Sequence, residues 1–97
     1  VYSQDVTVLQ INAEWNKKNN YDLSDITGAT VKFSYLKDQP KEVQNSIMAV
    51  PVIVIMDESG RVRMQYVADI SLQIKATHLE IQNTIDRLKR TRRASTN

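Results

Sequence analysis

Four short segments of the chain carry the hydrophobic pattern of β-strands. Val6–Ala13 and Val50–Met56 are almost continuously apolar and rich in β-branched residues, which is typical of buried strands. Thr30–Leu36 and Arg61–Ala68 alternate apolar with polar or charged residues, as half-exposed strands do. Asp57–Gly60 separates the last two strands, and its acidic start and final glycine predict a hairpin turn.

Three further segments carry helical signals. Two apolar residues three positions apart predict a short helix within the polar stretch Glu14–Gly28. A proline in the first turn predicts a helix over Pro40–Met48. An apolar stripe at helical spacing predicts a long helix over Gln73–Lys89. A start nearer Thr77, with Leu72 in a covering loop, fits the last segment equally well.

The order of these elements predicts an α/β fold. The first strand, short helix and second strand can form a right-handed crossover unit, and the last two strands form a hairpin. We therefore expect a mixed four-stranded sheet flanked by helices. The 97 residues favour one domain, which we assign to residues 1–90, followed by a basic C-terminal tail over residues 91–97.

Composition narrows the possible chemistry. The chain has no cysteine, which excludes a thiol nucleophile, a disulfide and a thiolate metal site. A single histidine makes a zinc site improbable, and we expect no metal and no cofactor. We find neither a signal-peptide pattern at the start nor an apolar run long enough to span a membrane. The expected location is therefore intracellular (cytoplasmic) or within a virion.

Two short motifs flank the predicted buried strands. Ala13-Glu14-Trp15 at the end of the first strand is similar to the segment that leads into the active site in the thioredoxin family. The next four residues, Asn16-Lys17-Lys18-Asn19, stand where the family has Cys-Gly-Pro-Cys. Val50-Pro51 resembles the family loop with a cis-proline, so we expect a cis peptide here. The resemblance covers roughly residues 6–90 and implies a thioredoxin-like sheet with a shortened active-site helix.

The same resemblance implies that the redox chemistry has been lost. Asn16 and Asn19 replace both cysteines, and Gln10 stands where the family carries a buried aspartate. A carboxamide has no ionisable proton at neutral pH and cannot attack a disulfide. We therefore expect no enzyme, but a redox-inactive protein-binding module or structural subunit of a larger assembly, with a virus or phage particle as one example. The degenerate active-site face would then bind the partner protein through Trp15, Asn16, Asn19, Val50 and Pro51.

Less specific interpretations compete for the same residues. Trp15 can cover the core, and Val50-Pro51 can be an inherited feature without a ligand. Lys17 and Lys18 can form a small anion site with the neighbouring amides, or simply a solvated loop. The acids Glu14, Asp22 and Asp25 have no spacing that suggests acid–base catalysis. A packed or boundary role is favoured for His78.

A basic cluster near the C-terminus supports an alternative function. Its members are Arg87, Lys89, Arg90, Arg92 and Arg93. A helix C-terminus that complements its dipole accounts for two or three such charges, not five. The cluster could dock on an acidic protein surface or neutralise the phosphates of a nucleic acid. No aromatic residue interleaves with it, so base stacking is not offered.

Overall fold

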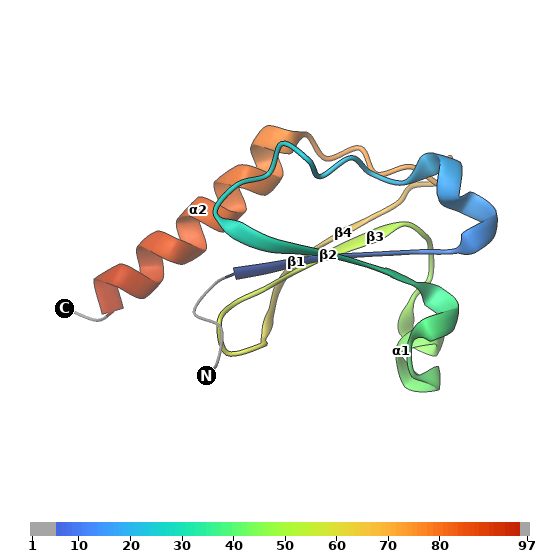
Figure 1. Cartoon of the computed structure of the whole chain (residues 1–97), viewed down its shortest axis with the longest axis horizontal. Coiled ribbons are helices and arrows are strands. Elements are labelled where there is room, and N and C mark those ends of the chain that lie inside the picture. The colour runs from blue at the N-terminus through green and yellow to red at the C-terminus, as the bar shows by residue number, and fades with distance from the viewer. Residues whose placement is uncertain (1–5, 96–97) are drawn as a thin grey trace.

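The structure is a computed structural model, described for residues 6–95 and, within these, for the side chains of residues 6–90. It contains four strands, two α-helices and two 3₁₀ helices within residues 6–95 (Figure 1). In order they are β1 (Val6–Asn12), the 3₁₀ helix η1 (Glu14–Asn19), β2 (Ala29–Tyr35), the 3₁₀ helix η2 (Leu36–Asp38), α1 (Lys41–Ser46), β3 (Val52–Met56), β4 (Val62–Val67) and α2 (His78–Ser95).

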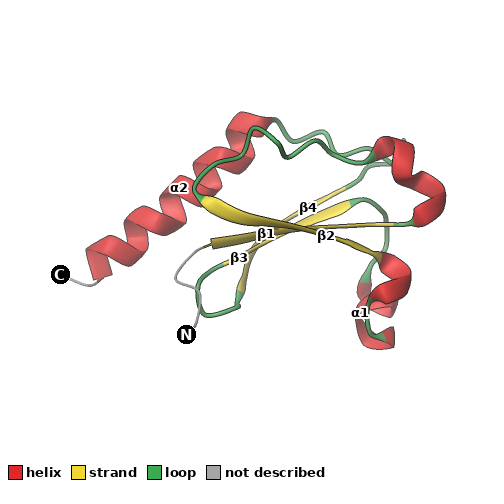
Figure 2. Ribbon diagram, viewed as in Figure 1, coloured by secondary structure: helices red, strands yellow, loops and turns green. Residues whose placement is uncertain are grey.

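The four strands form one mixed sheet in the order β2-β1-β3-β4. β1 and β2 run parallel, whereas β3 pairs antiparallel with both β1 and β4. Helices and 3₁₀ turns lie above the sheet, below it and at one end (Figure 2). The predicted α/β fold, a mixed four-stranded sheet flanked by helices, is therefore confirmed, and this arrangement is compatible with the expected thioredoxin-like one.

The core lies between the sheet and α2. Alternation along β1 and β3 turns Val8, Ile53 and Ile55 to this side, where their side chains are fully buried. Ile81 and Ile85, which are one helical turn apart on α2, pack against them and are also fully buried. The apolar stripe predicted from the sequence therefore makes the main contact between helix and sheet.

The opposite face of the sheet is covered only in part. α1 has six residues and lies below one end of the sheet (Figure 1). Val62 and Val67 of β4 point to this face and remain 51% and 49% exposed. Together with the β1 and β3 residues beside them, they line an open apolar groove of about 450 Å³.

The boundaries of several elements differ from the sequence-based expectation. Residues 20–28 form a loop rather than a short helix, although the expected apolar residues Leu23 and Ile26 are buried against the core. α2 begins at His78, so the later of the two predicted starts is correct and Leu72 lies in a loop. Thr77 explains this start, because its hydroxyl accepts a hydrogen bond from the Glu80 N–H.

Two local expectations are confirmed. The Val50–Pro51 peptide is cis. Gly60 has a φ of 88° in the β3–β4 turn, a conformation that favours glycine. At its far end α2 runs on to Ser95, so the backbone of residues 91–95 continues the helix into the segment assigned to the tail.

The β3–β4 turn is organised by the carboxylate of Asp57. Its Oδ1 accepts hydrogen bonds from the Ser59 hydroxyl at 2.6 Å and from the Ser59 and Arg61 N–H groups at 3.0 Å. Its Oδ2 pairs with Arg63 at 3.2 Å. The Ser59 hydroxyl, followed by the Arg61 N–H and the Arg63 guanidinium, lowers the pKa of Asp57 from 3.8 to about 2.

We predict that this turn makes the protein sensitive to acid. Because the folded pKa of Asp57 lies below the unfolded value, its contribution is complete above pH ~5 and is lost as pH falls toward ~2. Asp57→Asn should lower stability near neutral pH and flatten its decline in acid, as measured by urea unfolding at a series of pH values. Asp25→Asn, at an exposed carboxylate, is the matched control. An unchanged acid slope in Asp57→Asn would contradict the assignment.

Candidate functional site

Three loops meet at the end of the sheet where β1 leads into η1. They are η1 itself with Ala13 before it, the segment 47–51 that ends in the cis-proline, and the turn 68–73 after β4. The side chain of Asn16 in η1 is hydrogen-bonded to both of the other loops. This is the end of the molecule to which the predicted partner-binding residues belong.

The Asn16 carboxamide lies at the centre of this end. Its side chain is only 2% exposed. Its Nδ2 atom lies 3.3 Å from each of three acceptors, namely Asn12 Oδ1, the Val50 carbonyl and the Leu72 carbonyl. Two N–H bonds are therefore shared among three oxygens, and the donor capacity of this amide is fully used within the protein.

Further carboxamides extend the contact into a network. Asn19 Nδ2 donates to Asn16 Oδ1 at 2.7 Å, and Gln73 Nε2 reaches Asn19 Oδ1 at 3.4 Å. Asn12, which is fully buried, donates to the Asn16 carbonyl at 3.0 Å and to Asn20 Oδ1. None of these five side chains can ionise at working pH, so the network offers hydrogen bonds but neither a proton to transfer nor a nucleophile.

The turn opposite Asn16 contains an unusual backbone conformation. Leu72 has a φ of 63°, a left-handed value that costs a residue with a branched side chain roughly 1–3 kcal/mol. Asp69 holds the turn, because its carbonyl accepts from the Leu72 N–H at 2.9 Å and its carboxylate accepts from the Ser71 N–H at 2.9 Å. The Leu72 carbonyl accepts the hydrogen bond from Asn16, so the conformation is fixed on both sides.

The predicted partner-binding residues are close together but not equally accessible. Asn16 and Pro51 are buried, and Val50 is 5% exposed. Asn19 is half-buried within the carboxamide network. Trp15 is 70% exposed and does not cover the core. Of the five, Trp15 is the side chain that a partner could contact most directly.

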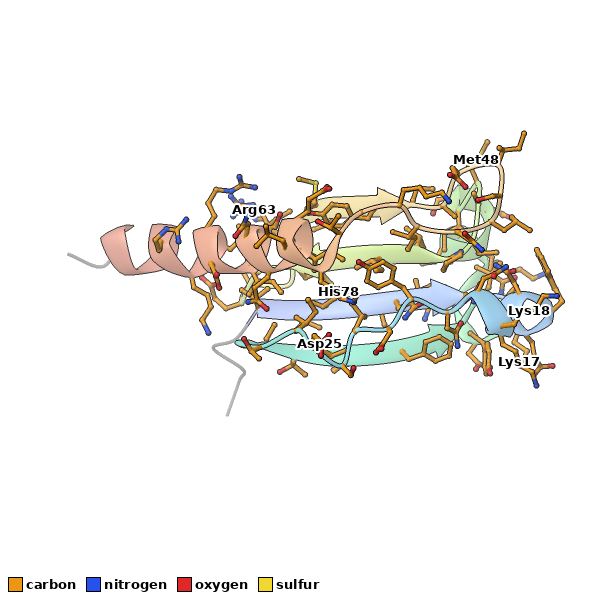
Figure 3. The ribbon with its side chains drawn as sticks, turned by 90° about the horizontal axis from the view of Figure 1, so that it is seen from above. Lys17, Lys18, Asp25, Met48, Arg63 and His78 are labelled. Atoms are coloured by element: carbon orange, nitrogen blue, oxygen red, sulfur yellow. The ribbon has the colours of Figure 1, made fainter. Side chains whose placement is uncertain are left out.

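Two exposed apolar residues at this end were not singled out from the sequence. Met48 is 91% exposed in the loop before the cis-proline, and Ile70 is fully exposed in the turn 68–73. Figure 3 shows Met48 projecting from the same end of the sheet as Lys17 and Lys18. Each of the three tied loops thus carries one large exposed apolar side chain. The only sequence signal for these two residues is that each is an apolar residue outside the predicted strands, and such a signal is weak evidence for a binding site.

Charged side chains lie on the surface around the η1 end of the molecule and are not part of the carboxamide network. Lys17 and Lys18 are exposed on η1 and point away from the sheet (Figure 3). Lys37 pairs with Glu14 at 3.0 Å, and its hydrogen bond lowers the pKa of that carboxyl. The Asn16 amide is turned inward, so it is not available to the anion site that the sequence left open.

The remaining candidates are structural contacts elsewhere in the protein. Gln10 is buried and bonds the Tyr21 backbone through both ends of its amide, at 2.9 and 2.7 Å. His78 Nε2 lies 2.6 Å from the Asp22 carbonyl, and its ring rests against Tyr21. Burial raises the pKa of Tyr21, whose hydroxyl donates to the Ala76 carbonyl at 2.6 Å. These contacts attach the 20–28 loop to the body of the protein.

The basic cluster does not join this site. α2 leads away from the η1 end and extends past the sheet (Figure 1). Arg87 and Arg90 are exposed on it, whereas Lys89 Nζ donates to the Gly28 carbonyl at 2.8 Å. The side chains of Arg92 and Arg93 lie outside the described residues.

Comparison with known proteins provides no family for the chain. No protein-family model matches it, and no curated protein shows significant sequence similarity to it. Within residues 6–95, no helix is long and apolar enough to cross a membrane. The described side chains also include no group of three or more histidines or acids that could hold a metal ion.

We predict that a charge at position 16 destabilises the fold in a pH-dependent manner. In Asn16→Asp a carboxylate oxygen would face the Val50 and Leu72 carbonyls, so its folded pKa should rise above the unfolded value. Stability should be close to wild type at low pH and fall as pH rises through about 4, with a loss of roughly 1–3 kcal/mol near neutrality.

Urea unfolding between acidic and neutral pH measures this effect. Asn83→Asp introduces the same charge at an exposed position of α2 and should have little effect at any pH. Equal behaviour of the two variants would show that the Asn16 amide is not a buried donor.

Proposed function

We propose that this chain is a non-catalytic, redox-inactive relative of thioredoxins that binds other proteins as a subunit of a larger assembly. The observation that carries the proposal is the position of Asn16, which is buried at the centre of three loops and donates hydrogen bonds to the Val50 and Leu72 carbonyls. The mixed sheet and the cis Val50–Pro51 peptide beside this residue are compatible with such a relationship.

Chemistry at this position argues against catalysis. Thiol–disulfide exchange needs a thiolate, and the chain contains no cysteine. The groups nearest to Asn16 are carboxamides and backbone carbonyls, whose hydrogen-bonding capacity is used within the fold. A site for acid–base or nucleophilic work requires an ionisable group within reach of a substrate, and the carboxamide network has none.

The exposed side chains at the same end support a binding role. Trp15, Met48 and Ile70 come from the three loops that Asn16 ties together. Aromatic and flexible apolar side chains of this kind act as anchors in protein interfaces. Because hydrogen bonds hold the loops in place, little conformational freedom would be lost on binding.

A permanent neighbour fits these features better than a transient ligand. Three large apolar side chains are exposed at the same end of the molecule, and a stable protein contact would remove their surface from water. A larger assembly, such as a virus or phage particle, would provide such a neighbour. The partner that we propose is therefore another protein subunit.

Crosslinking in the native source tests this function. Lys17 and Lys18 belong to the same short helix, η1, as Trp15, so an amine-reactive reagent should join them to the partner. Mass spectrometry should locate the crosslinks at these two lysines. Trp15→Ala should weaken recovery of the partner about tenfold or more, as expected for an interface anchor. Leu79→Ala is the control, because Leu79 is 69% exposed on α2 and lies outside the η1 end. A chain that is monomeric and without crosslinks in its native extract would defeat the proposal.

A second candidate function rests on α2. The helix extends beyond the sheet with Arg87 and Arg90 exposed, which places a basic surface at the end opposite η1. Such a surface, together with the basic residues that follow, could contact the phosphate backbone of a nucleic acid. This role is compatible with protein binding at the η1 end, because the two surfaces are separate.

The second function predicts a steep dependence on salt. If the basic cluster contacts phosphates, the logarithm of affinity for a DNA duplex or RNA strand should fall linearly with the logarithm of salt concentration. Replacing Arg87 and Arg90 by glutamine should reduce that slope by roughly one for each lost contact. The same change at Lys17 and Lys18 should leave it unaltered. Binding that is absent, or insensitive to salt, would eliminate this candidate.

A further inference from the structure

Among the described residues, no strand pairs with the outer edge of β2. β2 is the first strand of the sheet and pairs over all seven residues with β1 on its inner side. Among residues 6–95, no backbone hydrogen bond joins β2 to any other segment on its outer side. The outward-facing peptide groups of this strand therefore have no backbone partner within the described part of the chain, in the arrangement that an added strand would complete.

β2 is less protected than the other edge of the sheet. β4 contains an irregularity in its pairing with β3 opposite Ile55 and Met56. Bulges of this kind discourage pairing with a further strand. β2 runs in regular register with β1 over its whole length, and each edge strand holds one charged residue, Arg63 in β4 and Lys32 in β2.

An apolar groove runs beside this open edge. Because residues 20–28 form a loop rather than a helix, Val31 and Phe33 on the α2 side of the strand remain 42% and 45% exposed. They form one wall of a groove of about 510 Å³, and Tyr21, Leu23 and Ile26 of the loop line the other wall.

Hydrogen bonds fix the loop that forms the outer wall. Thr27 is bonded to the Gln82 amide of α2 through both its N–H, at 2.9 Å, and its carbonyl, at 2.8 Å. Lys89 holds the Gly28 carbonyl next to it. The groove is therefore preformed, and a strand added to β2 would place every second side chain over it.

Charges around the edge restrict the strand that fits. The pairing register places Lys32 opposite Leu9, on the face of the sheet away from α2. Lys32 is exposed and forms no ion pair with any described residue. Asp25 lies on the loop above β2, on the face of the sheet that α2 covers (Figure 3). A complementary strand would carry an acidic residue beside Lys32 and uncharged apolar residues on the groove side.

The same charge disfavours a second copy of this chain. Antiparallel pairing of two β2 strands about their midpoint would place Lys32 opposite Lys32, and like charges in directly opposed positions are destabilising. The midpoint register would also be the one that brings Val31 of each copy beside Phe33 of the other. Self-association in this register is therefore less favourable than pairing with an acidic strand.

We propose that the β2 edge binds an extended segment of a partner protein, which adds a fifth strand to the sheet. The segment alternates apolar residues, which lie over the Val31–Phe33 groove, with polar ones that include an acid beside Lys32. This inference rests on the proposed protein-binding function but uses a surface other than the Trp15 end, so that either could fail without the other.

Two synthetic peptides test the charge and the pairing together. Each matches the seven residues of β2 in length, alternates Val with Thr, and carries either Glu or Lys in place of the central Thr. Fluorescence anisotropy should show that the wild-type protein binds the Glu peptide roughly two- to tenfold tighter than the Lys peptide. Lys32→Glu should reverse this preference. Lys41→Glu, at an exposed lysine of α1 that has no ion pair within the described residues, should not reverse it.

Backbone pairing is tested separately. A version of the Glu peptide that is N-methylated at alternate residues keeps its side chains but cannot form the ladder, and it should lose binding. Amide NMR shifts on binding should be confined mainly to residues 21–35, and Trp15→Ala should not alter them. Any of four results would overturn this inference. They are no peptide binding, the same affinity for both peptides, undiminished binding of the methylated peptide, and dimerisation of the protein through β2. The two proposals can be told apart. If the peptides fail to bind but Trp15→Ala still loses its crosslinks to the partner, the β2 inference is wrong and the proposed function stands.

Discussion

The Asn16 carboxamide is the contact on which the end of the molecule depends. A buried amide is stable only when its hydrogen bonds are satisfied, and here the partners come from three separate parts of the chain. The positions of η1, the loop before Pro51 and the turn around Leu72 are thus linked through one side chain. Because its donors are used to hold these loops, they are not free for chemistry, and structural and catalytic roles exclude each other at this position.

A second constraint is the loop that takes the place of a helix before β2. The backbone of residues 20–28 cannot satisfy its own hydrogen bonds as a helix would, so side chains from other elements satisfy part of them, notably Gln10 and Gln82. The loop is narrower than a helix, which leaves Val31 and Phe33 of β2 partly uncovered. One local change in secondary structure therefore creates both a fixed wall and an accessible apolar groove.

The four strands and their succession along the chain could be predicted because their signal is local. Continuous apolar runs mark β1 and β3, and alternation marks the edge strands. The short helix predicted around Leu23 and Ile26 was wrong because the contacts that decide this segment come from residues far away in sequence. The burial of Asn16 could not be read from the chain either, since asparagine is usually exposed and two of its three acceptors, the Val50 and Leu72 carbonyls, lie in distant segments.

Incomplete cover of the sheet links the surfaces at which we expect partners. α1 is too short to close one face, the 20–28 loop is too thin to close the other above β2, and the three loops at the η1 end expose Trp15, Met48 and Ile70. Single apolar residues on a surface need no explanation, but an open strand edge beside an apolar groove is a feature that isolated proteins avoid. The stability of the core does not require these exposures, because Ile53, Ile55, Ile81 and Ile85 are fully buried without them. What the exposed regions have in common is that another protein chain could complete each of them, which is the physical basis for treating this domain as part of an assembly.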